Sequence, residues 1–325
     1  NPVPAGFFIC LFICYLLIIM PELPEVETTV SGLNAVLPGL KITGVWSDFH
    51  KKTKHGHKEN IKNIGYFKKF KKEILGRKIL NVKRRGKNIL IELSGGKTIL
   101  AHMKMTGHFL FGRYEYLPKK DSWAATENGP LKDPYNRFVH FVISLSNKKH
   151  LAFSDTRKFG KIIVFETRLG DNIPDLSHLG PEPLVKNFDL GAFKNALNKR
   201  SSGKIKQVLM DQSLIAGIGN IYSDEILWLS GIHPESRVRK IPGSKVKEMF
   251  RAVKLLLKTG LNLRGDSTSD YRNIYGEKGS FQLHHKAYRE TGKGCRKKNC
   301  AGVIERKMVG GRSAHFCSKH QIRYT

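Results

Sequence analysis

A helical repeat of apolar residues begins just after residue 20. The apolar positions recur every three or four residues, at Val26, Val30, Leu33 and Val36 or Leu37. Pro38 and Gly39 come next, and this pair does not continue a helix, so the pattern predicts a helix that ends before them. The helix dipole favours negative charge at a helix start, and this start carries Glu22, Glu25 and Glu27.

Short apolar runs in the next part of the chain predict antiparallel β-strands. Residues 89–93 and 98–103 flank Gly95 and Gly96, which is the pattern of a β-hairpin. Three further runs, at 138–145, 151–153 and 162–165, continue the β pattern. Several short strands joined by turns are typical of a β-sandwich.

The pattern changes to helical after a proline-containing segment at 170–187, which reads as a linker. Phe193 and Leu197 start one amphipathic segment, and apolar residues continue at 208–214 and 221–229. A last helix is predicted over 246–257, with Ser244 as its N-cap and Gly260 at its end.

The length of 325 residues favours more than one domain. We predict an α+β chain with an antiparallel β-sandwich and flanking helices, followed by a helical domain and a β-hairpin metal finger. The expected boundaries are an apolar leader at 1–19, the sandwich at 20–168, the linker at 169–187, the helical domain at 188–282 and the finger at 283–325.

The charge of the chain indicates a polyanionic partner. Lys and Arg number 57 against 27 Asp and Glu, a formal net charge of +30. Hydrophobic residues make up 40%, which excludes a disordered basic tail, a collagen-like chain and a polytopic membrane protein. Solubility needs far less charge, so nucleic acid is the first candidate. The lysine-rich stretch at 51–72 fits either a solvated loop or a DNA-facing surface.

Residues 7–19 form an uninterrupted apolar run before the first methionine, Met20. The run is short for a membrane span, which needs about 20 residues. It lacks a preceding basic residue and a following small-residue cleavage site, so it is a poor signal peptide. One interpretation is a leader or anchor. We favour the other, an over-extended reading frame whose start is Met20, because removal of that methionine leaves Pro21 as the N-terminus.

Four residues near the C-terminus have the spacing of a metal site. They are Cys295, Cys300, Cys317 and His320. Two close pairs separated by a hairpin-length spacer suit tetrahedral zinc, and such a cluster indicates a reducing compartment rather than a disulfide scaffold. We predict one structural Zn²⁺ that stabilises a small β-hairpin. Gly310 and Gly311 lie near the expected hairpin tip, next to Arg312.

Other motifs are weaker. Gly217-Ile-Gly219-Asn220 lacks the third glycine of a dinucleotide motif, but it opens a helical run whose backbone amides could hold a phosphate; a tight turn is the alternative. Gly95-Gly96-Lys97-Thr98 lacks the first glycine of a P-loop and reads as a turn. The histidine pairs 55/57 and 284/285 are weak metal candidates, and solvated histidines explain them better.

A terminal Pro21 would be chemically reactive. Its secondary amine would titrate near ~8, so a useful fraction is neutral at cellular pH. Such an amine can attack a sugar C1′ and form an iminium intermediate. Glu22 adjoins it and is a candidate proton donor. By spacing alone, an ordinary helix start is the better explanation of both residues.

Several motifs in order along the chain resemble the bacterial formamidopyrimidine-DNA glycosylase family. The resemblance spans Met20 to Gln321 and leaves out the leader. It rests on segments 20–28 (MPELPEVET), 84–87 (RRGK), 102–107 (HMKMTG), 155–160 (DTRKFG), 205–212 (IKQVLMDQ) and 217–222 (GIGNIY), with Asp224, Glu225 and the cysteine hairpin.

The resemblance implies a bifunctional base-excision repair enzyme with a β-sandwich, a helix–two-turn–helix domain and a zinc finger. Such an enzyme would excise oxidised purines, such as 8-oxoguanine and formamidopyrimidines, and cleave the abasic strand by β,δ-elimination. It implies Pro21 as the Schiff-base nucleophile, Glu22 as the proton donor with help from Glu25, Lys87 in β-elimination and Arg312 in δ-elimination.

The resemblance also implies DNA contacts. Lys87, Asn220 and Arg312 would clamp phosphates, and Met105, Arg157 and Phe159 would fill the gap left by an extruded nucleotide. For Met105 and Phe159 the alternative is a place in the core. The remaining expected DNA-binding residues are His140 (or Phe138 in its place), Arg200, Lys206 and Tyr271, and the segment 267–272 would cover the flipped base.

The expected partner is double-stranded DNA with oxidised bases or abasic sites, bound by a monomer in the bacterial cytoplasm at the nucleoid, without a small-molecule cofactor or a membrane. The chain departs from the family pattern in the four-residue spacer between Cys295 and Cys300 and in His320 where cysteine is usual. Two alternatives stay open. One is an oxidised-pyrimidine glycosylase of the same superfamily, which Leu23 disfavours because those relatives usually carry glycine there. The other is a non-catalytic zinc-containing DNA-binding protein, if the leader is retained.

Overall fold

The computed structural model describes residues 20–50 and 60–325. The first part of the chain forms two four-stranded antiparallel sheets. One has the order β1-β8-β9-β5, with bounds Ile42–Ser47, Val139–Leu145, His150–Asp155 and Gly107–Gly112. The other has the order β10-β4-β3-β2, with bounds Lys161–Glu166, Lys97–His102, Asn88–Leu93 and Ile79–Arg85.

The predicted β-sandwich is therefore confirmed, including its hairpin. Strands β3 and β4 pair in register with Leu90 opposite Leu100. Gly95 and Gly96 in the connecting turn both have a positive φ, at 72° and 70°, the conformation that a tight hairpin turn between right-twisted strands requires. Strands β1, β2 and β5 were not predicted. In β1 and β2 the apolar positions are interrupted by polar or glycine residues, and β5 offers a run of only three apolar residues between Gly107-His108 and Gly112.

Helices flank the sandwich and fill the second half of the chain. Helix α2 spans Ile64–Ile74, within the lysine-rich stretch, and packs on β10; residues 51–59 of that stretch lie outside the described residues. The later helices are α3 (Leu190–Asn198), α4 (Ile205–Met210), α5 (Asn220–Ser230) and α6 (Gly243–Asn262). A small hairpin, β6 (Tyr114–Leu117) and β7 (Ser122–Ala125), extends from the sandwich, and a second one, β11 (Ile304–Val309) and β12 (Arg312–Cys317), follows the helices.

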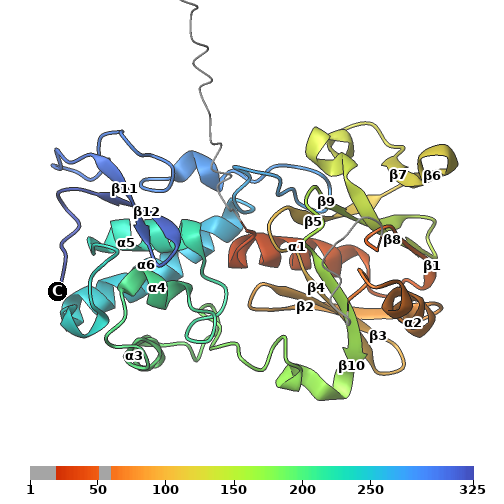
Figure 1. The fold of residues 1–325 in the computed structure, drawn as a ribbon, viewed down its shortest axis with the longest axis horizontal. Coiled ribbons are helices and arrows are strands. Elements are labelled where there is room, and N and C mark those ends of the chain that lie inside the picture. Colours follow the sequence, from red (N-terminus) through yellow and green to blue (C-terminus); the bar gives the residue numbers. More distant parts are fainter. Residues whose placement is uncertain (1–19, 51–59) are drawn as a thin grey trace, which may run out of the picture.

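Helix α1, Leu23–Val36, links the two halves of the molecule. Figure 1 shows it between the strands on one side and the helices on the other. Its first residue, Leu23, packs in the core of the helical half, whereas Val26, Val30 and Leu33 pack in the core between the two sheets. The helix ends before Pro38-Gly39 as predicted, and Gly39 takes a φ of 91°.

The connection at 167–189 is anchored to this junction by one acidic residue. Glu182 accepts hydrogen bonds from Arg84 Nη1 at 2.6 Å and from the Gly86 amide at 2.5 Å. Arg84 also pairs with Glu27 of α1 at 2.6 Å. Charge-assisted bonds of this kind are stronger than neutral ones, so the linker holds the turn between β2 and β3 against α1.

Three sequence predictions about the helices are wrong in detail. The helix expected through 208–214 ends at Met210, because the side chain of Gln212 bonds the Met210 and Ile218 carbonyls and folds 211–218 into a turn. Helix α6 starts at Gly243 behind Pro242, and Ser244 lies inside it rather than capping it. Gly260 also lies inside α6, which continues to Asn262.

The reason for a glycine at 260 is close packing, not helix termination. A Cβ at this position would collide with the ring and hydroxyl of Tyr222 on α5. That hydroxyl donates to Glu25 Oε1 at 3.0 Å. The missing side chain therefore lets α5 and α6 approach while Tyr222 reaches α1.

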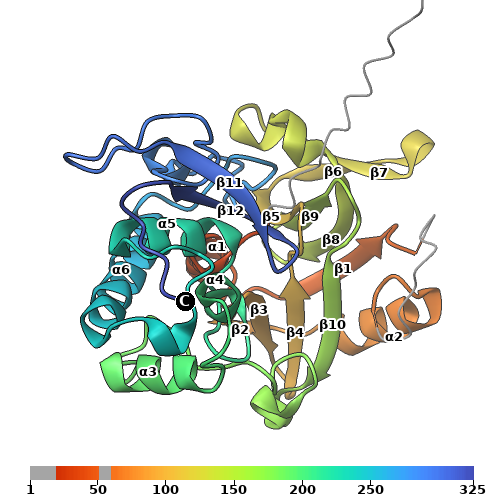
Figure 2. The same ribbon diagram turned by 60° about the vertical axis from the view of Figure 1, so that its left-hand side comes forward.

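The hairpin β11–β12 reaches from the helical half toward the strands, as Figure 2 shows. Its turn is formed by Gly310 and Gly311, with φ of 59° and 75°, as predicted for the hairpin tip. Within the described parts of the chain, no helix is both long and apolar enough to cross a membrane.

We expect Gly260→Ala to destabilise the protein by about 2 kcal/mol or more, because the added methyl group must displace Tyr222. Gly243→Ala is the matched control: it lies at the start of the same helix, and a Cβ there meets nothing within 4 Å, so its stability should stay within about 0.5 kcal/mol of the wild type or rise slightly. Urea unfolding measures both. Equal effects at the two positions would contradict this packing account.

Candidate functional site

The carboxylate of Glu22 is bound at the N-terminus of helix α5. Its oxygens accept hydrogen bonds from the backbone amides of Gly219 at 2.6 Å and Ile221 at 2.7 Å, with a longer contact of 3.4 Å to the amide of Tyr222. These are the free donors at the positive end of a helix dipole. The sequence suggested that they hold a phosphate; in this structure they hold Glu22 instead.

Two glycines make this arrangement possible. At Gly219 a Cβ would collide with the Glu22 carboxyl and would lie 2.7 Å from Lys87 Nζ. At Gly217, where φ is 98°, a Cβ would strike Leu23. The Gly217 carbonyl instead accepts the Leu23 amide at 3.0 Å. The Gly217-Ile-Gly219 sequence therefore serves as a docking surface for the start of α1.

A second buried acid, Glu25, lies one helical turn behind Glu22. Its Oε2 accepts the Glu22 backbone amide at 2.7 Å, and its Oε1 accepts the Tyr222 hydroxyl at 3.0 Å and the Asp266 amide at 2.8 Å. Burial, together with the negative charges of Glu22 and Asp266, raises its pKa to about 8. Glu25 therefore titrates near neutral pH, unlike a solvated carboxyl.

Lys87 faces Glu22 from the sandwich side. Burial raises the pKa of Glu22, and the positive charge of Lys87 opposes this rise. Burial likewise lowers the pKa of Lys87, against the attraction of Glu22 and Glu25. An acid and a base whose pKa values move toward each other in a buried site are suited to proton transfer.

Glu22 and Lys87 line a pocket at the junction of the two halves. Its wall consists of Met20, Glu22, Lys87, Met210, Gly219, Asn220, Ile221, Tyr288 and Arg312. Pro21 is buried and lies between Met20 and Glu22 in the chain. Arg312 comes from the tip of the β11–β12 hairpin and is close enough to lower the pKa of Lys87. Glu22, Lys87 and Arg312, predicted for catalysis from three distant segments, thus line one pocket.

Met105, Arg157 and Phe159 form a cluster on the sandwich surface. The Arg157 guanidinium lies 4.5 Å from the centre of the Phe159 ring, and its Nη1 contacts the Met105 sulfur at 3.5 Å. Phe159 is 44% exposed, and Met105 is half-buried. The alternative that these apolar side chains belong to the core is therefore wrong for Phe159. The three side chains lie together as one group, in which Phe159 is exposed and Met105 and Arg157 are half-buried.

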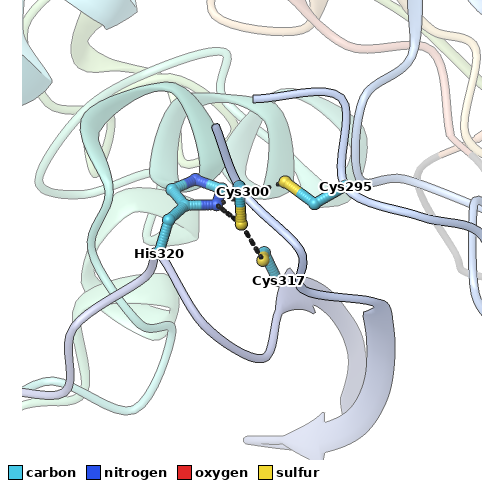
Figure 3. Close-up of side chains that lie close together, drawn as sticks. All are labelled: Cys295, Cys300, Cys317 and His320. Atoms are coloured by element: carbon cyan, nitrogen blue, oxygen red, sulfur yellow. Dashed lines mark hydrogen bonds between the residues drawn. The ribbon is translucent and has the colours of Figure 1, made fainter. Parts of the chain in front are cut away.

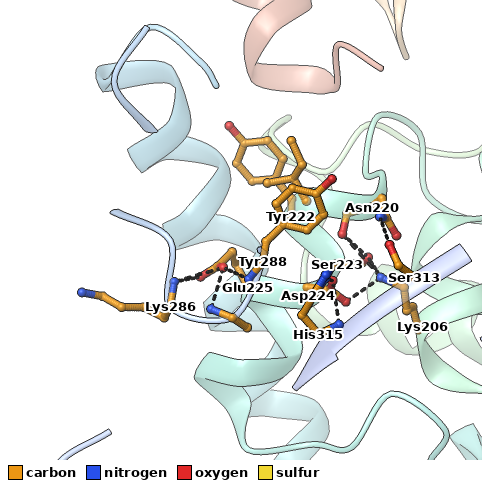
Figure 4. A network of polar contacts seen from close by, with 12 residues as sticks. Lys206, Asn220, Tyr222, Ser223, Asp224, Glu225, Lys286, Tyr288, Ser313 and His315 are labelled. Atoms are coloured by element: carbon orange, nitrogen blue, oxygen red, sulfur yellow. Dashed lines mark hydrogen bonds and ion pairs between the residues drawn. The ribbon is translucent and has the colours of Figure 1, made fainter. Parts of the chain in front are cut away.

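Lys206, predicted to contact DNA, is instead a buried structural residue. Its side chain and that of Asp224 are both 0% exposed, and Nζ lies 2.5 Å from Asp224 Oδ1. Asp224 also accepts the His315 amide at 3.0 Å and contacts His315 Nδ1 at 2.8 Å. Figure 4 shows this network joining α4, α5 and β12. It fixes the hairpin strand that begins with Arg312.

The other expected DNA-binding residues differ in exposure. Tyr271 is buried, and its hydroxyl donates to the Glu25 carbonyl at 3.0 Å, so the structure does not place it on a binding surface. His140 is half-buried and pairs with Asp48 at 2.9 Å, and Phe138 is also half-buried. Arg200 is exposed beside Asp211 at 2.6 Å. Asn220 lines the pocket, and its Nδ2 contacts Ser313 Oγ at 3.3 Å.

The predicted metal ligands converge. The ligand atoms of Cys295, Cys300, Cys317 and His320 all lie within 4.8 Å of one another (Figure 3). Backbone amides donate to the three sulfurs: Lys297 to Cys295 at 3.5 Å, Gly302 to Cys300 at 3.4 Å and Lys319 to Cys317 at 3.4 Å. His320 directs Nδ1 toward the sulfurs, and its Nε2 contacts the Trp228 carbonyl at 2.9 Å. Hydrogen bonds from the backbone to the ligand residues orient metal ligands. The cluster can therefore bind one metal ion.

Of the two histidine pairs that the sequence offered as weak metal candidates, the described one is not part of the cysteine cluster. His55 and His57 lie outside the described residues. His284 is exposed, as expected of a solvated histidine, but the expectation is wrong for its neighbour: His285 is buried and pairs with Asp266.

Two residues of the site were not singled out from the sequence. Tyr222 and Asp266 both bind Glu25, one by its hydroxyl and the other by its backbone amide. Tyr222 lies within the motif 217–222 that was quoted for the family resemblance. The glycine at position 260, which packs against Tyr222, was the one feature of the sequence that could have indicated this close contact. The Asp266 contact uses only a backbone group, so no side-chain pattern reveals it.

Two family models match the chain. The formamidopyrimidine-DNA glycosylase N-terminal domain matches residues 20–162, and the formamidopyrimidine-DNA glycosylase H2TH domain matches residues 179–272. Among curated proteins, a formamidopyrimidine-DNA glycosylase of Pelotomaculum thermopropionicum is 37% identical over 298 residues, which cover 92% of this chain and 98% of the relative.

Solved structures agree with this match over most of the chain. The Lactococcus lactis Fpg in complex with DNA containing an abasic site superimposes with a TM-score of 0.76 at 29% identity, covering 93% of this chain and 100% of that one. A structure of MutM with DNA containing carbocyclic 8-oxo-G gives a TM-score of 0.75 at 30% identity, with the same coverage.

We expect Glu25→Gln to change how stability depends on pH. The folded protein holds the Glu25 proton more tightly than the unfolded chain, since its pKa rises from 4.5 to about 8. The stability from this group is thus fully present below pH 4.5 and is lost as the pH rises through about 8. Glutamine keeps the shape without the titration. The wild type should therefore lose about 1 kcal/mol or more relative to Glu25→Gln between pH 5 and 8.5.

Urea unfolding at several pH values measures this difference. Glu92→Gln, on the sandwich surface beside Lys83, is the control and should follow the wild-type curve. Parallel curves for wild type and Glu25→Gln would show that Glu25 does not titrate in this range.

Proposed function

The chain belongs to the formamidopyrimidine-DNA glycosylase family, and we propose that it excises oxidised purines from DNA and cleaves the resulting abasic strand. The observation that carries the proposal is the pocket in which Glu22, Lys87 and Arg312 meet beside Pro21. The related structures contain DNA with an abasic site or an 8-oxo-G analogue, which supports the choice of substrate. The net charge of +30 suits a duplex DNA partner.

In the first step, Pro21 acts as the nucleophile when it is the N-terminal residue. Its amine forms a bond to the sugar C1′ while the glycosidic bond breaks and the amine loses its proton. The C1′–O4′ bond then breaks, O4′ takes up a proton, and an open-chain iminium remains at C1′. Glu22 lies next in the chain and is held on the α5 amides. Its raised pKa suits the donor of the proton that base departure requires.

Strand cleavage then uses the two cations of the pocket. An iminium at C1′ makes the C2′ proton acidic, and its removal expels the 3′ phosphate; a second elimination expels the 5′ phosphate. Lys87, whose pKa burial lowers, is suited to assist the first elimination. Arg312 is suited to the second, and with Lys87 and Asn220 it would hold the flanking phosphates.

Base removal also requires that the damaged nucleotide leave the helix. Extrusion costs a few kcal/mol. The group of Met105, Arg157 and Phe159 can offset part of this cost by entering the gap, since an apolar side chain replaces lost stacking and a guanidinium faces the orphaned base. Arg200 and His140 are further candidate contacts to the DNA backbone.

We assign the metal of the C-terminal cluster as zinc in a structural role. Three sulfurs and one imidazole nitrogen complete a tetrahedral set with no open position, the donor set that zinc favours. When bound, the ion supplies folding energy for the finger and no chemistry at the sugar. His320 is held by the Trp228 carbonyl, so it fits the position where the family usually has cysteine.

We propose a sandwich unit at 20–168, a linker at 169–187, a helical unit at 188–282 and a finger at 283–325. We also propose a monomer that works at the nucleoid in the bacterial cytoplasm, because its substrate would be chromosomal DNA.

We expect the wild-type protein to release 8-oxoguanine from a duplex in which the lesion faces cytosine. Glu22→Gln should reduce the single-turnover rate of base release by at least about 100-fold, since general acid catalysis contributes a factor of this order, while binding to the duplex persists. Glu92→Gln is the control and should match the wild type. Release of the free base is measured by chromatography. Binding without base release by the wild type would favour the non-catalytic alternative.

We expect one zinc ion per chain, and His320→Ala should lose most of it. His178→Ala, which changes an exposed histidine, should keep the full content. Native mass spectrometry counts the ion, and elemental analysis identifies it. Loss of zinc should also weaken DNA binding, because the hairpin that carries Arg312 loses its support. Full zinc content in His320→Ala would refute the ligand assignment.

A further inference from the structure

The outer side of helix α6 carries a row of basic residues that the proposed chemistry does not use. Lys247, Arg251, Lys254 and Lys258 recur at intervals of four, three and four residues, so they lie along one face of the helix. Three of them are exposed, and Lys254 is half-buried. These four residues form the basic stripe, which extends over roughly 16 Å at the rise of an α-helix.

Acidic neighbours do not neutralise the basic stripe. The one acid of α6, Glu248, pairs with Lys245 at 2.6 Å, outside the stripe. Asp189 acts on Lys254 through its charge, but burial and the charge of Lys258 lower the pKa of Lys254. Within the described parts of the chain, the other three side chains of the stripe form no ion pair. Like charges three or four residues apart destabilise a helix, so helix stability does not explain the stripe.

The surface next to the stripe is also basic. Phe193 of α3 packs against Phe250 of α6, with 5.6 Å between the ring centres, so α3 lies beside this part of α6. Lys194 and Lys199 are exposed there, and residues 190–200 contain no acid. Positive charge therefore continues from α6 onto α3.

The basic stripe faces away from the pocket. On the buried side of α6, Gly260 packs against Tyr222, whose hydroxyl reaches Glu25 behind Glu22. With about 3.6 residues per turn, the stripe lies about 150° around the helix from Gly260. The described residues that line the pocket come from other elements. Figure 2 shows α6 at the outer edge of the helical half, away from the tip of the β11–β12 hairpin. A duplex bound at the pocket therefore leaves the stripe open.

The chemistry of the stripe fits the backbone of nucleic acid. A duplex presents a phosphate charge about every 1.7 Å along its axis, so a row of cations about 16 Å long can meet several phosphates at once. An anionic membrane is a poorer fit, because a helix that binds there inserts an apolar face. The apolar face of α6 is buried in the helical core, and Leu255 is the large apolar residue that it exposes, at 57%.

We propose that the basic stripe of α6 binds the backbone of a second DNA duplex while a first duplex occupies the pocket. One protein molecule then bridges two DNA segments and can pass between them without release into solution. This inference goes beyond the proposed function, which concerns only the duplex at the pocket. Because the contacts are to phosphates, the second site accepts undamaged DNA of any sequence and weakens with salt.

The test measures bridging between two labelled duplexes. The full-length protein is first bound to a donor-labelled duplex that contains a non-cleavable abasic analogue, and an undamaged acceptor-labelled duplex is then added at about 50 mM salt. We expect energy transfer between the duplexes, and native mass spectrometry should count one protein and two duplexes in the complex. The triple variant Lys247→Gln, Arg251→Gln, Lys258→Gln should bind the second duplex at least about tenfold more weakly, with a salt slope smaller by about 3. Its affinity for the first duplex should stay within about twofold.

The matched control removes the same charge from another helix. Lys68→Gln, Lys71→Gln, Lys72→Gln changes three exposed lysines of α2 and should keep the bridging. All six substituted side chains are exposed, and binding of the first duplex verifies that each variant is folded.

Three results would overturn the proposal. They are undiminished bridging in the α6 variant, an equal loss in the α2 variant, and bridged complexes that contain two protein copies. Binding of an RNA duplex or an acidic peptide in place of the second DNA duplex would assign the stripe to another polyanion and would also contradict the proposal. Absence of base release by the wild type would refute the proposed function alone, since neither duplex in this test has to be cleaved.

Discussion

The site depends on one interaction, the binding of the Glu22 carboxylate by the amides of Gly219 and Ile221 at the start of α5. It joins the first residues of the sandwich half to the helical half with charge-assisted bonds inside a buried junction. Because a helix N-terminus offers fixed donors, the carboxylate is oriented without side-chain partners. The position of Pro21 follows, since it immediately precedes Glu22 in the chain.

The surrounding structure supports that interaction and places the residues around it. Glu25 holds the Glu22 amide from within α1, and Tyr222 holds Glu25 from α5. On the other side, Asp224 binds Lys206 and His315 in a buried network, which sets the strand that begins with Arg312. The cysteine and histidine cluster supports the same hairpin from its far end. The proposed chemistry thus uses cations from the sandwich and the finger, placed around an acid held between them.

Much of this arrangement was predictable from sequence, for a physical reason. Strands β3 and β4 and the metal cluster are set by local patterns, a glycine pair in one case and ligand spacing in the other. The convergence of Glu22, Lys87 and Arg312 required the family resemblance, because no local pattern links segments so far apart. Buried polar residues were the main failures. Lys206, Tyr271 and His285 carry polar groups typical of a surface, and only their tertiary partners, Asp224, the Glu25 carbonyl and Asp266, explain their burial. Gly260 was likewise misread, because a helix end and a close helix contact both favour glycine.

The central claim is that the amine of Pro21 performs the chemistry, and the site of covalent attachment tests it most directly. Borohydride reduction during the reaction with 8-oxoguanine duplex should trap a protein–DNA adduct. After nuclease and protease digestion, mass spectrometry of the labelled peptide identifies the modified residue. We expect the added mass on the amine of Pro21, in a peptide that begins at this residue. An adduct on Lys87 or another lysine, or an adduct formed by a chain that still carries residues before Pro21, would contradict the account.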